Sequence, residues 1–504
     1  MSFPTDPKEK TPSADLENEQ SLSPTHSARE GVSAAYEAKS RLINEYLQNE
    51  IGFGRYQWQL FVLTGLGWAA DDIWLQGVAI ILPQIGNELK PVRVEHATMA
   101  LYAGLIVGAI TWGVLADLIG RRLSSNVTLF LAGVFGVAAG GANSFITLAA
   151  LIACMGFGYL LTLLSVWWAA GQLLASLIAW PLIANFSCAS ANDCTKTVNM
   201  GWRYTFGGIT LLMWVLRYIV FDLQESPKYL VAKGRDEDAL KVLEHIASVN
   251  GKTLTLTLAQ LQAASNEKNA AGISMSNWQI IKHSLSSFSL SHVKPLFSTR
   301  RLALNTSITI ALWGLIGLAY PLFNGFFPLY LTTHVEGGSS SVSTTYRNYV
   351  IFSILSIPGS VIACLVVDWS RKSESGFSIG GRKLAMAVFT ALTGIFLFLF
   401  TTSTTQADAS FIIRRAINQQ LTWITTKVFP APHRGTGDAI CSSFNRMTGI
   451  LAPAIKIVTT PMSGNASQAT ANAPIFVAAS LFLVSAILMV FLPIEVSVRF
   501  TFND

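Results

Sequence analysis

Long apolar runs separated by short polar stretches dominate this chain of 504 residues. Most runs are roughly 18–25 residues long, the length that an α-helix needs to cross a bilayer. The pattern therefore predicts an all-α membrane protein with twelve spanning helices. The runs fall near residues 57–86, 95–117, 123–142, 145–158, 159–184, 203–222, 302–332, 347–367, 384–402, 411–428, 437–459 and 474–494.

Six runs precede a long polar stretch and six follow it, which is typical of transporters built from two related halves. The first fifty residues are polar and rich in Ser, Pro, Glu and Lys, so we expect them to be disordered. The predicted domains are a cytoplasmic tail over 1–50, a six-helix half over 51–222, a connector over 223–300, a second half over 301–495 and a tail over 496–504.

The connector contains GRDEDALKVLEHIASVNG, with an acidic start, apolar residues at helical spacing and a closing Gly251. This pattern predicts a short amphipathic helix. A solvated surface helix is the simpler interpretation, and a brace for a gate is the alternative.

Two runs fit the pattern poorly. The fourth, FITLAALIACMGFG, is short for a helix that must cross about 30 Å of hydrocarbon. The tenth, FIIRRAINQQLTWITTKVF, carries two arginines and two glutamines and would insert poorly by itself. The fourth and tenth spans are therefore doubtful, and an inactive variant remains an alternative.

Composition excludes several classes of protein. Only 13% of the residues are charged, against about 25% in soluble domains, and the mean hydropathy is +0.44. The chain has no P-loop motif and no metal-binding histidine pair such as H-E-x-x-H. We therefore expect no enzyme activity, no cofactor, no metal and no nucleic-acid partner.

Basic residues gather in alternate loops, which places both termini and the connector in the cytoplasm by the positive-inside rule. Cys188 and Cys194 then share an outer loop, where they form a disulfide or stay as two free thiols; an oxidising compartment favours the disulfide. Asn465 and Asn185 would also lie outside, as acceptors for glycosylation.

Similar loop motifs occur at matching places in the two halves. The stretch GVLADLIGRR supplies Gly113, Asp117, Gly120, Arg121 and Arg122, and its counterpart VVDWSRKSESGFSIGGRK supplies Asp368, Gly381 and Arg382. Glycine permits close helix contact and a tight turn, while the arginines would stay at the cytoplasmic surface. One such motif could be a simple membrane anchor, but a matched pair indicates a repeated fold.

These stretches resemble the loop signature of the major facilitator superfamily. Two further blocks agree: ESPKYLVAKGR, with Glu225, Ser226 and Pro227, and FPAPHRGTG, with Arg434 and Gly435. The first of these blocks is similar to one in the sugar porter, organic ion and synaptic-vesicle-protein-like branches. The opening IGFGRYQWQLFVLTGLGWAAD is similar to that of the synaptic-vesicle-protein-like and organic acid transporter branches. The resemblance implies a monomeric transporter of two six-helix halves, with these motifs as gating elements.

Ionisable residues inside spans are candidates for function, because burying them in hydrocarbon is costly. They are Asp71, Asp72, Arg217, Arg446 and Lys456. Arg217 and Lys456 lie near span ends, where their side chains could instead reach the membrane surface. Arg446 shares a small, polar helix face with Asn445, which favours a cavity lining.

The adjacent Asp71 and Asp72 point about 100° apart on a helix. Analysis of the helix faces favours Asp72, whose face carries Gln76, whereas the resemblance places the proton-titrating carboxylate at Asp71 and leaves Asp72 as a hydrogen-bonding residue. The stretch PLFNGFFPLY predicts a break in the helix of the seventh run. We expect the substrate to bind beside this break and beside the two aspartates. The predicted substrate-binding residues are Trp68, Trp74, Gln76, Asn324, Asn445 and Arg446.

The sequence therefore predicts a secondary transporter that carries a small organic solute together with protons across a lipid bilayer. A buried carboxylate can link proton binding to substrate binding, and a buried arginine favours organic or aromatic acids. A sugar or polyol porter is the close alternative, and a non-transporting receptor is the alternative from another class. We expect the plasma membrane, with an internal membrane as the alternative.

Overall fold

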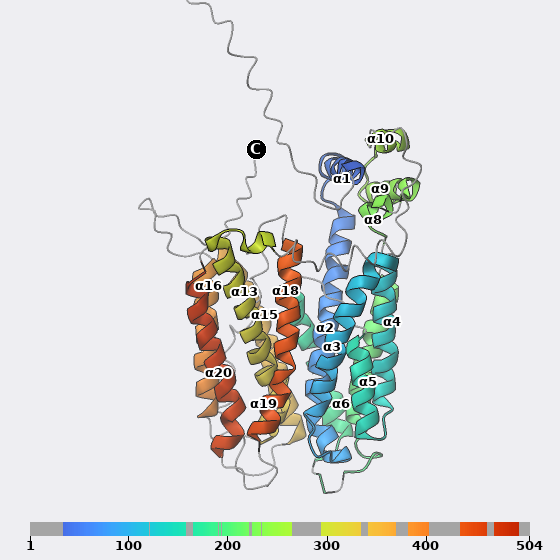
Figure 1. Cartoon of the computed structure of the whole chain (residues 1–504). Coiled ribbons are helices and arrows are strands. Elements are labelled where there is room, and N and C mark those ends of the chain that lie inside the picture. The colour runs from blue at the N-terminus through green and yellow to red at the C-terminus, as the bar shows by residue number, and fades with distance from the viewer. Residues whose placement is uncertain are drawn as a thin grey trace, which may run out of the picture. The chain divides into compact units, whose positions relative to one another are not determined.

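The computed structural model describes residues 34–119, 121–157, 165–189, 191–192, 194–220, 224–232, 234–264, 294–333, 341–368, 382–402, 434–460 and 468–492. Within these ranges the chain forms helices and connecting turns, and no strand (Figure 1). It divides into two compact units: one joins Phe53–Ser226 to Met275–Asp504, and the other joins Met1–Gly52 to Pro227–Ser274.

The larger unit begins with helices that match the first six apolar runs. The fourth of them is short, 13 residues, as its run predicts. These helices are α2 (Arg55–Leu89), α3 (His96–Ile119), α4 (Arg121–Gly140), α5 (Phe145–Phe157), α6 (Ser165–Phe186) and α7 (Gly201–Val220).

The later helices of the larger unit match five of the remaining six runs, and the tenth run lies outside the described residues. These helices are α13 (Arg300–Asn324), α14 (Phe327–Thr333), α15 (Val342–Asp368), α16 (Arg382–Thr401), α18 (Arg434–Gly449), α19 (Leu451–Thr459) and α20 (Gln468–Val490). The break expected in the seventh run is confirmed, because α13 ends at Asn324 and α14 begins at Phe327.

Four helical stretches of the described chain are long and apolar enough to cross a membrane, by length and composition alone. They are Arg122–Gly140, Trp167–Phe186, Arg300–Thr332 and Asn472–Val490. Three shorter apolar helices accompany them: His96–Trp112, Phe145–Phe157 and Met386–Thr401.

Helix packing in the larger unit depends on close backbone contact. In the first half α2 lies against α6, and α3 lies against α5; in the second half α13 lies against α18 and α20 (Figure 1). A side chain at Gly171 of α6 would overlap the carbonyl of Ala69 in α2, and one at Gly104 would overlap the carbonyl of Ala153. Glycine at these two positions lets the helices approach, as small residues do in membrane bundles.

The smaller unit pairs the end of the N-terminal segment with the connector. It contains α1 (Ala34–Tyr46), the short π-helix η1 (Leu47–Ile51), α8 (Pro227–Ala232), α9 (Asp236–Val249) and α10 (Leu258–Ala263). Lys39 of α1 forms an ion pair of 2.6 Å with Asp236 of α9, and Ile43 is fully buried. The expectation of a disordered tail over residues 1–50 is therefore wrong for residues 34–50; residues 1–33 lie outside the described chain.

The amphipathic helix expected in the connector is confirmed as α9. It buries Ala239, Leu243 and Ile246, and three acidic residues in its first turn favour the positive end of the helix dipole. Gly251 follows with a φ of 68°, a left-handed conformation that glycine adopts without strain. The apolar face of α9 is thus covered by the unit's own core.

Candidate functional site

Asp72 lies in the interior of the larger unit, on α2, with no exposed surface. Its Oδ1 accepts a hydrogen bond of 3.2 Å from Nε2 of Gln76, one helical turn along. The main chain of Gln172 in α6 approaches the carboxylate, but Oδ2 accepts no hydrogen bond of normal geometry from the described residues. Within the described chain, no ion pair includes Asp72.

Gln76 joins Asp72 to helices of the second half. Its Nε2 also lies 3.3 Å from the hydroxyl of Tyr320 in α13, and its Oε1 accepts a bond of 2.7 Å from the hydroxyl of Tyr349 in α15. Tyr349 is fully buried, Tyr320 is partly buried, and Gln76 is 2% exposed. One amide thus contacts a carboxylate of the first half and two hydroxyls of the second.

The Tyr320 hydroxyl is the centre of this network. It accepts hydrogen bonds from Nε1 of Trp168 in α6, at 3.0 Å, and from Nδ2 of Asn324, at 2.6 Å. Asn324 is the last residue of α13, directly before the break in the seventh span. The break therefore places a polar side chain among the aromatic residues, as transporters do at their substrate sites.

Other polar side chains lie around the network. Trp74 is 4% exposed, and its Nε1 has no hydrogen-bond partner among the described residues; Gln172 is 1% exposed, and its side chain approaches the hydroxyl of Tyr349. Tyr102 of α3 is close enough to Asp72 to interact with its charge, and its ring packs against Gly449 of α18. The surroundings combine aromatic surface with polar groups that are available for hydrogen bonding.

Arg446 and Asn445 lie on α18 but do not join the network. Arg446 is 8% exposed, and its Nη1 lies 3.5 Å from the carbonyl oxygen of Leu105 in α3, in the first half. Asn445 donates instead to the carbonyl oxygen of Trp313, at 2.9 Å. Arg446 is therefore a buried cation where the halves meet, and Asn445 holds α18 against α13.

Lys456 does not reach the surface as its position near a span end suggests. It is 4% exposed, and its Nζ lies 4.1 Å from the ring centre of Tyr330 and 5.3 Å from that of Phe326. Cation–π contact of this kind stabilises a desolvated ammonium. Glu95 of the first half, 5% exposed, adds electrostatic attraction.

Three further hydrogen bonds join the halves near the Leu89 end of α2. Tyr346 donates to the carbonyl oxygen of Ile80 at 2.8 Å, and Nη1 of Arg93 donates to the carbonyl oxygen of Thr460 at 2.7 Å. Nε1 of Trp180 donates to the hydroxyl of Ser343 at 3.2 Å. The halves are thus held together at this end of the unit.

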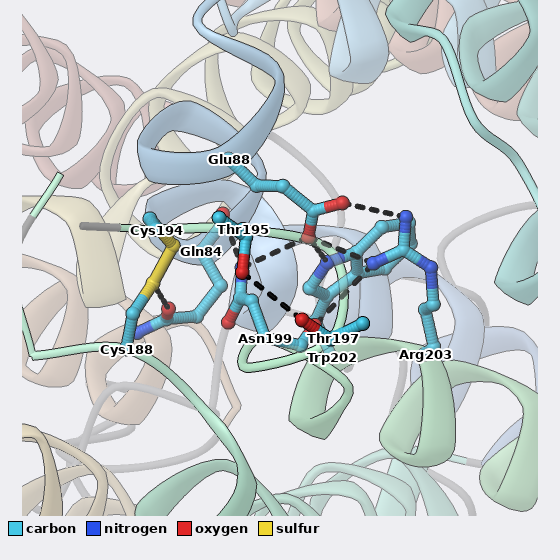
Figure 2. The surroundings of a disulfide bond; sticks show 9 residues. All are labelled: Gln84, Glu88, Cys188, Cys194, Thr195, Thr197, Asn199, Trp202 and Arg203. Carbon is cyan, nitrogen blue, oxygen red and sulfur yellow. Dashed lines mark hydrogen bonds and ion pairs between the residues drawn. A yellow bond between two sulfur atoms is a disulfide. The ribbon is translucent and has the colours of Figure 1, made fainter. Parts of the chain in front are cut away.

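Cys188 and Cys194 form a disulfide in the loop between α6 and α7, and Figure 2 shows the residues around it. Sγ of Cys188 lies 3.8 Å from Oε1 of Gln84 in α2. Asn199 from the same loop donates to the carbonyl oxygen of Gln84 at 3.0 Å and to Glu88 at 3.1 Å. The loop is therefore attached to the end of α2 by the side chains that follow the disulfide.

Two of the predicted gating motifs meet in the structure. The backbone N–H of Arg122, at the start of α4, lies 3.2 Å and 3.4 Å from the two carboxylate oxygens of Glu225. Glu225 also accepts from the N–H of Ser226, at 3.0 Å. A carboxylate at a helix N-terminus compensates unpaired N–H groups and the helix dipole, so Glu225 caps α4.

One of the two predicted glycosylation acceptors can be placed. Asn185 is exposed at the end of α6, where its Nδ2 donates to the carbonyl oxygen of Pro181 at 2.8 Å. Gly120, Gly381 and Asn465 lie outside the described residues. The structure assigns the following residues to helices but does not describe their side chains or surroundings: Trp68, Asp71, Gly113, Asp117, Arg121, Arg217, Asp368, Arg382, Arg434 and Gly435.

Among the described residues, no group of His, Cys, Asp and Glu side chains is arranged to hold a metal ion. Sequence patterns alone missed Tyr320, Tyr349 and Trp168. Tyrosines inside apolar runs, close in sequence to polar residues, were the signal that could have pointed to them. Their contact with Gln76 depends on the packing of separate helices, which no single run reveals.

The comparisons agree with this fold. The family model described as Major Facilitator Superfamily matches residues 60–417. The chain is 41% identical to "MFS siderochrome iron transporter 1" of Ceriporiopsis subvermispora, over 91% of each protein, and 35% identical to "Major facilitator-type transporter hxnZ" of Emericella nidulans, over 92% of this chain and 87% of the relative.

A solved structure of the xylose transporter XylE from E. coli, in an inward open conformation, aligns with a TM-score of 0.59. The alignment covers 87% of this chain and 97% of XylE at 16% identity, so it shows the fold alone. The predictions of an all-α transporter fold and of the family are confirmed. The chain is an integral, multi-pass membrane protein and belongs to the major facilitator superfamily.

Proposed function

We propose that this protein carries a small organic solute across its membrane by alternating access and couples that movement to protons. The observation that supports this most is the buried carboxylate of Asp72, linked through Gln76 to Tyr320 and Tyr349 of the other half. A charge that is buried without an ion pair marks an ion or substrate pathway in membrane proteins.

Asp72 is the carboxylate that we propose to bind the proton. Its hydrogen bond from Gln76 connects it to the network, which favours it over Asp71, the residue preferred from the resemblance. Asp71 stays the alternative, because its surroundings lie outside the described part of the chain.

For the solute we propose an organic acid, and an aromatic acid in particular. Arg446 supplies a buried cation where the halves meet, and cations of this kind bind carboxylates through several N–H donors. Trp74 and Trp168 supply aromatic surface near the same interface.

A sugar or polyol is the second candidate. The groups around Asp72 are mostly neutral donors and acceptors, with Gln76, Gln172 and Asn324 each carrying an amide. Such groups match hydroxyl-rich ligands as well as they match acids. The name of one relative, a siderochrome iron transporter, adds a siderochrome iron complex to the compounds worth testing.

Uptake into proteoliposomes with an imposed proton gradient tests the proposal. The panel contains labelled aromatic acids, aliphatic acids, sugars and a siderochrome iron complex, each with and without the gradient. We expect one acid to accumulate in a gradient-dependent manner, and Asp72→Asn to abolish accumulation while exchange of substrate for substrate continues.

The alternatives give different results. Loss of coupling in Asp71→Asn but not in Asp72→Asn would assign the proton to Asp71. Accumulation of a sugar in place of an acid would favour the porter, and binding by thermal shift without accumulation would identify a receptor and overturn the transporter proposal.

A further inference from the structure

We propose that Gln76 is the positioning residue that transmits the protonation of Asp72 to the second half of the transporter. The inference rests on the proton coupling proposed above and goes beyond it, because it names the group that carries the signal between the halves. It follows from three contacts of a single side-chain amide.

Three polar groups surround the amide of Gln76. Nε2 donates to Oδ1 of Asp72 at 3.2 Å and lies 3.3 Å from the hydroxyl of Tyr320, and Oε1 accepts from Tyr349 at 2.7 Å. At 2% exposure, Gln76 has little access to water that could replace a lost partner. A change at one contact must therefore affect the other two.

Protonation changes the hydrogen bonds that Asp72 can form with the amide of Gln76. The ionised carboxylate is an acceptor only, and its bond from Nε2 is charge-assisted, about twice as strong as a bond between neutral groups. The protonated carboxyl is also an O–H donor, and it requires an acceptor. Oε1 belongs to the same Gln76 amide whose Nε2 donates to Asp72, and it accepts one hydrogen bond, from Tyr349.

A turn of the Gln76 amide satisfies the new donor. It directs Oε1 toward Asp72 and Nε2 toward Tyr349, so that the hydroxyl of Tyr349 accepts from Nε2 where it had donated to Oε1, and the hydroxyl of Tyr320 loses its contact with Nε2. The hydrogen bonds across the halves are therefore rearranged when the proton binds and restored when it leaves. A hydrogen-bond arrangement that differs between the two protonation states favours one arrangement of the halves over the other and so shifts the equilibrium between them.

Among the side chains that the structure describes, the titratable groups that face Asp72 do not compete for this role. They are Tyr102 of α3, Tyr320 of α13 and Tyr349 of α15, which interact with its charge from three different helices. All three are phenols, which stay neutral across the pH range in which a carboxylate changes charge. Of these four side chains, the carboxylate of Asp72 is the one that changes charge in that pH range. Gln76 contacts two of the three phenols, Tyr320 and Tyr349.

The proton itself is the probe in the test. Spin labels at Val92→Cys and Val458→Cys lie on exposed positions of the two halves, 81% and 84% exposed, beside the contact of Arg93 with Thr460. The full-length protein, with Cys154, Cys364 and Cys441 replaced by alanine, is placed in lipid nanodiscs. The distance between the labels is measured at about pH 5 and about pH 8.

We expect the distance distribution of the parent protein to change with pH, and Asp72→Asn to abolish the change. Gln76→Met, which keeps the carboxylate and the side-chain length, should also abolish it, and Tyr349→Phe should reduce it. Tyr346→Phe is the matched control, because it removes a buried bond of 2.8 Å between the halves that does not involve Gln76. That variant should keep the pH response.

Two results would overturn the inference, and they can be told apart. If the parent protein and Asp72→Asn behave as expected but Gln76→Met responds to pH like the parent, Gln76 does not transmit the signal. If the parent protein shows no response to pH, proton coupling through Asp72 fails, and the role of Gln76 fails with it.

Discussion

Glu88 and Arg203 form a bidentate ion pair inside the first half, with both N–O distances at 2.7 Å (Figure 2). Their side chains are 5% and 4% exposed, and the guanidinium also lies 4.2 Å from the ring centre of Trp202. Trp202 donates to the same carboxylate at 2.9 Å. The pair fixes α7 to the end of α2.

Removing either member of this pair should destabilise the protein. We expect Glu88→Gln and Arg203→Met each to lower the free energy of unfolding by about 3–5 kcal/mol. The first leaves the guanidinium of Arg203 buried without a counter-charge, and the second leaves the carboxylate of Glu88 so. Thermal unfolding in nanodiscs measures the loss. The double variant should lose less than the sum, and additive effects would show that the two groups do not interact.

The disulfide between Cys188 and Cys194 closes a short loop of sequence separation 6. Closing a loop of this size stabilises a fold by about 2 kcal/mol through the entropy of the unfolded chain. The Cys188→Ala/Cys194→Ala variant should therefore unfold at a lower temperature, while Cys154→Ala, at an exposed free thiol, should not. Alkylation of Cys188 or Cys194 without prior reduction, detected by mass spectrometry, would contradict the bond.

Gly171 is the position where α6 approaches the backbone of α2 at Ala69. Gly171→Ala should force the helices apart, displace α2 near Asp72 and lower both the folded yield and the melting temperature. Gly207→Ala in α7 is the control, since a methyl group there meets no atom within 4 Å and alanine favours a helix over glycine by up to about 1 kcal/mol. Equal effects of the two substitutions would refute the packing argument.

Ile43 of α1 is buried in the core that α1 shares with the connector helices. Ile43→Ala should cost the smaller unit about 2–5 kcal/mol, the usual loss for a buried aliphatic side chain, and should raise hydrogen exchange in α9. Arg41→Ala on the exposed side of the same helix should leave exchange in α9 unchanged. Unchanged exchange in both variants would mean that α9 does not depend on α1.

Asp238 gives the start of α9 a dependence on pH. A hydrogen bond from Arg235 lowers the pKa of Asp238, so its contribution to stability is present above the pKa of the unfolded chain and is lost as pH falls through the pKa of the folded form. Asp238→Asn should weaken protection from hydrogen exchange in the first turn of α9 at neutral pH and have no effect in acid. A difference that grew in acid would reverse the assigned sign.

The sequence alone was sufficient for features that lie within one helix. The apolar runs predict the helices because each span must meet the same length of hydrocarbon, and Pro321, Gly325 and Pro328 predict the break after Asn324. The polar face of Asp72 and Gln76 likewise follows from helical spacing, and the two residues are hydrogen-bonded.

Partners on distant segments could not be predicted in this way. Gln76 contacts Tyr320 across 244 residues and Tyr349 across 273, and no periodicity within a helix reports such a contact. The N-terminal segment looked disordered for the same reason: Ile43 and Ile51 complete a core whose other members lie in the connector. A segment judged by its own composition cannot show a core that another segment completes.

The pairing of α1 with α8, α9 and α10 also limits how the transporter can be divided for fragment complementation. A break placed between residues 220 and 227 would leave α1 on one polypeptide and its partner helices on the other. A break after Ala264 would keep these helices on the polypeptide that carries α2 to α7. Co-expressed fragments that meet after Ala264 should therefore reassemble, whereas fragments that meet before Pro227 would each carry an incomplete hydrophobic core.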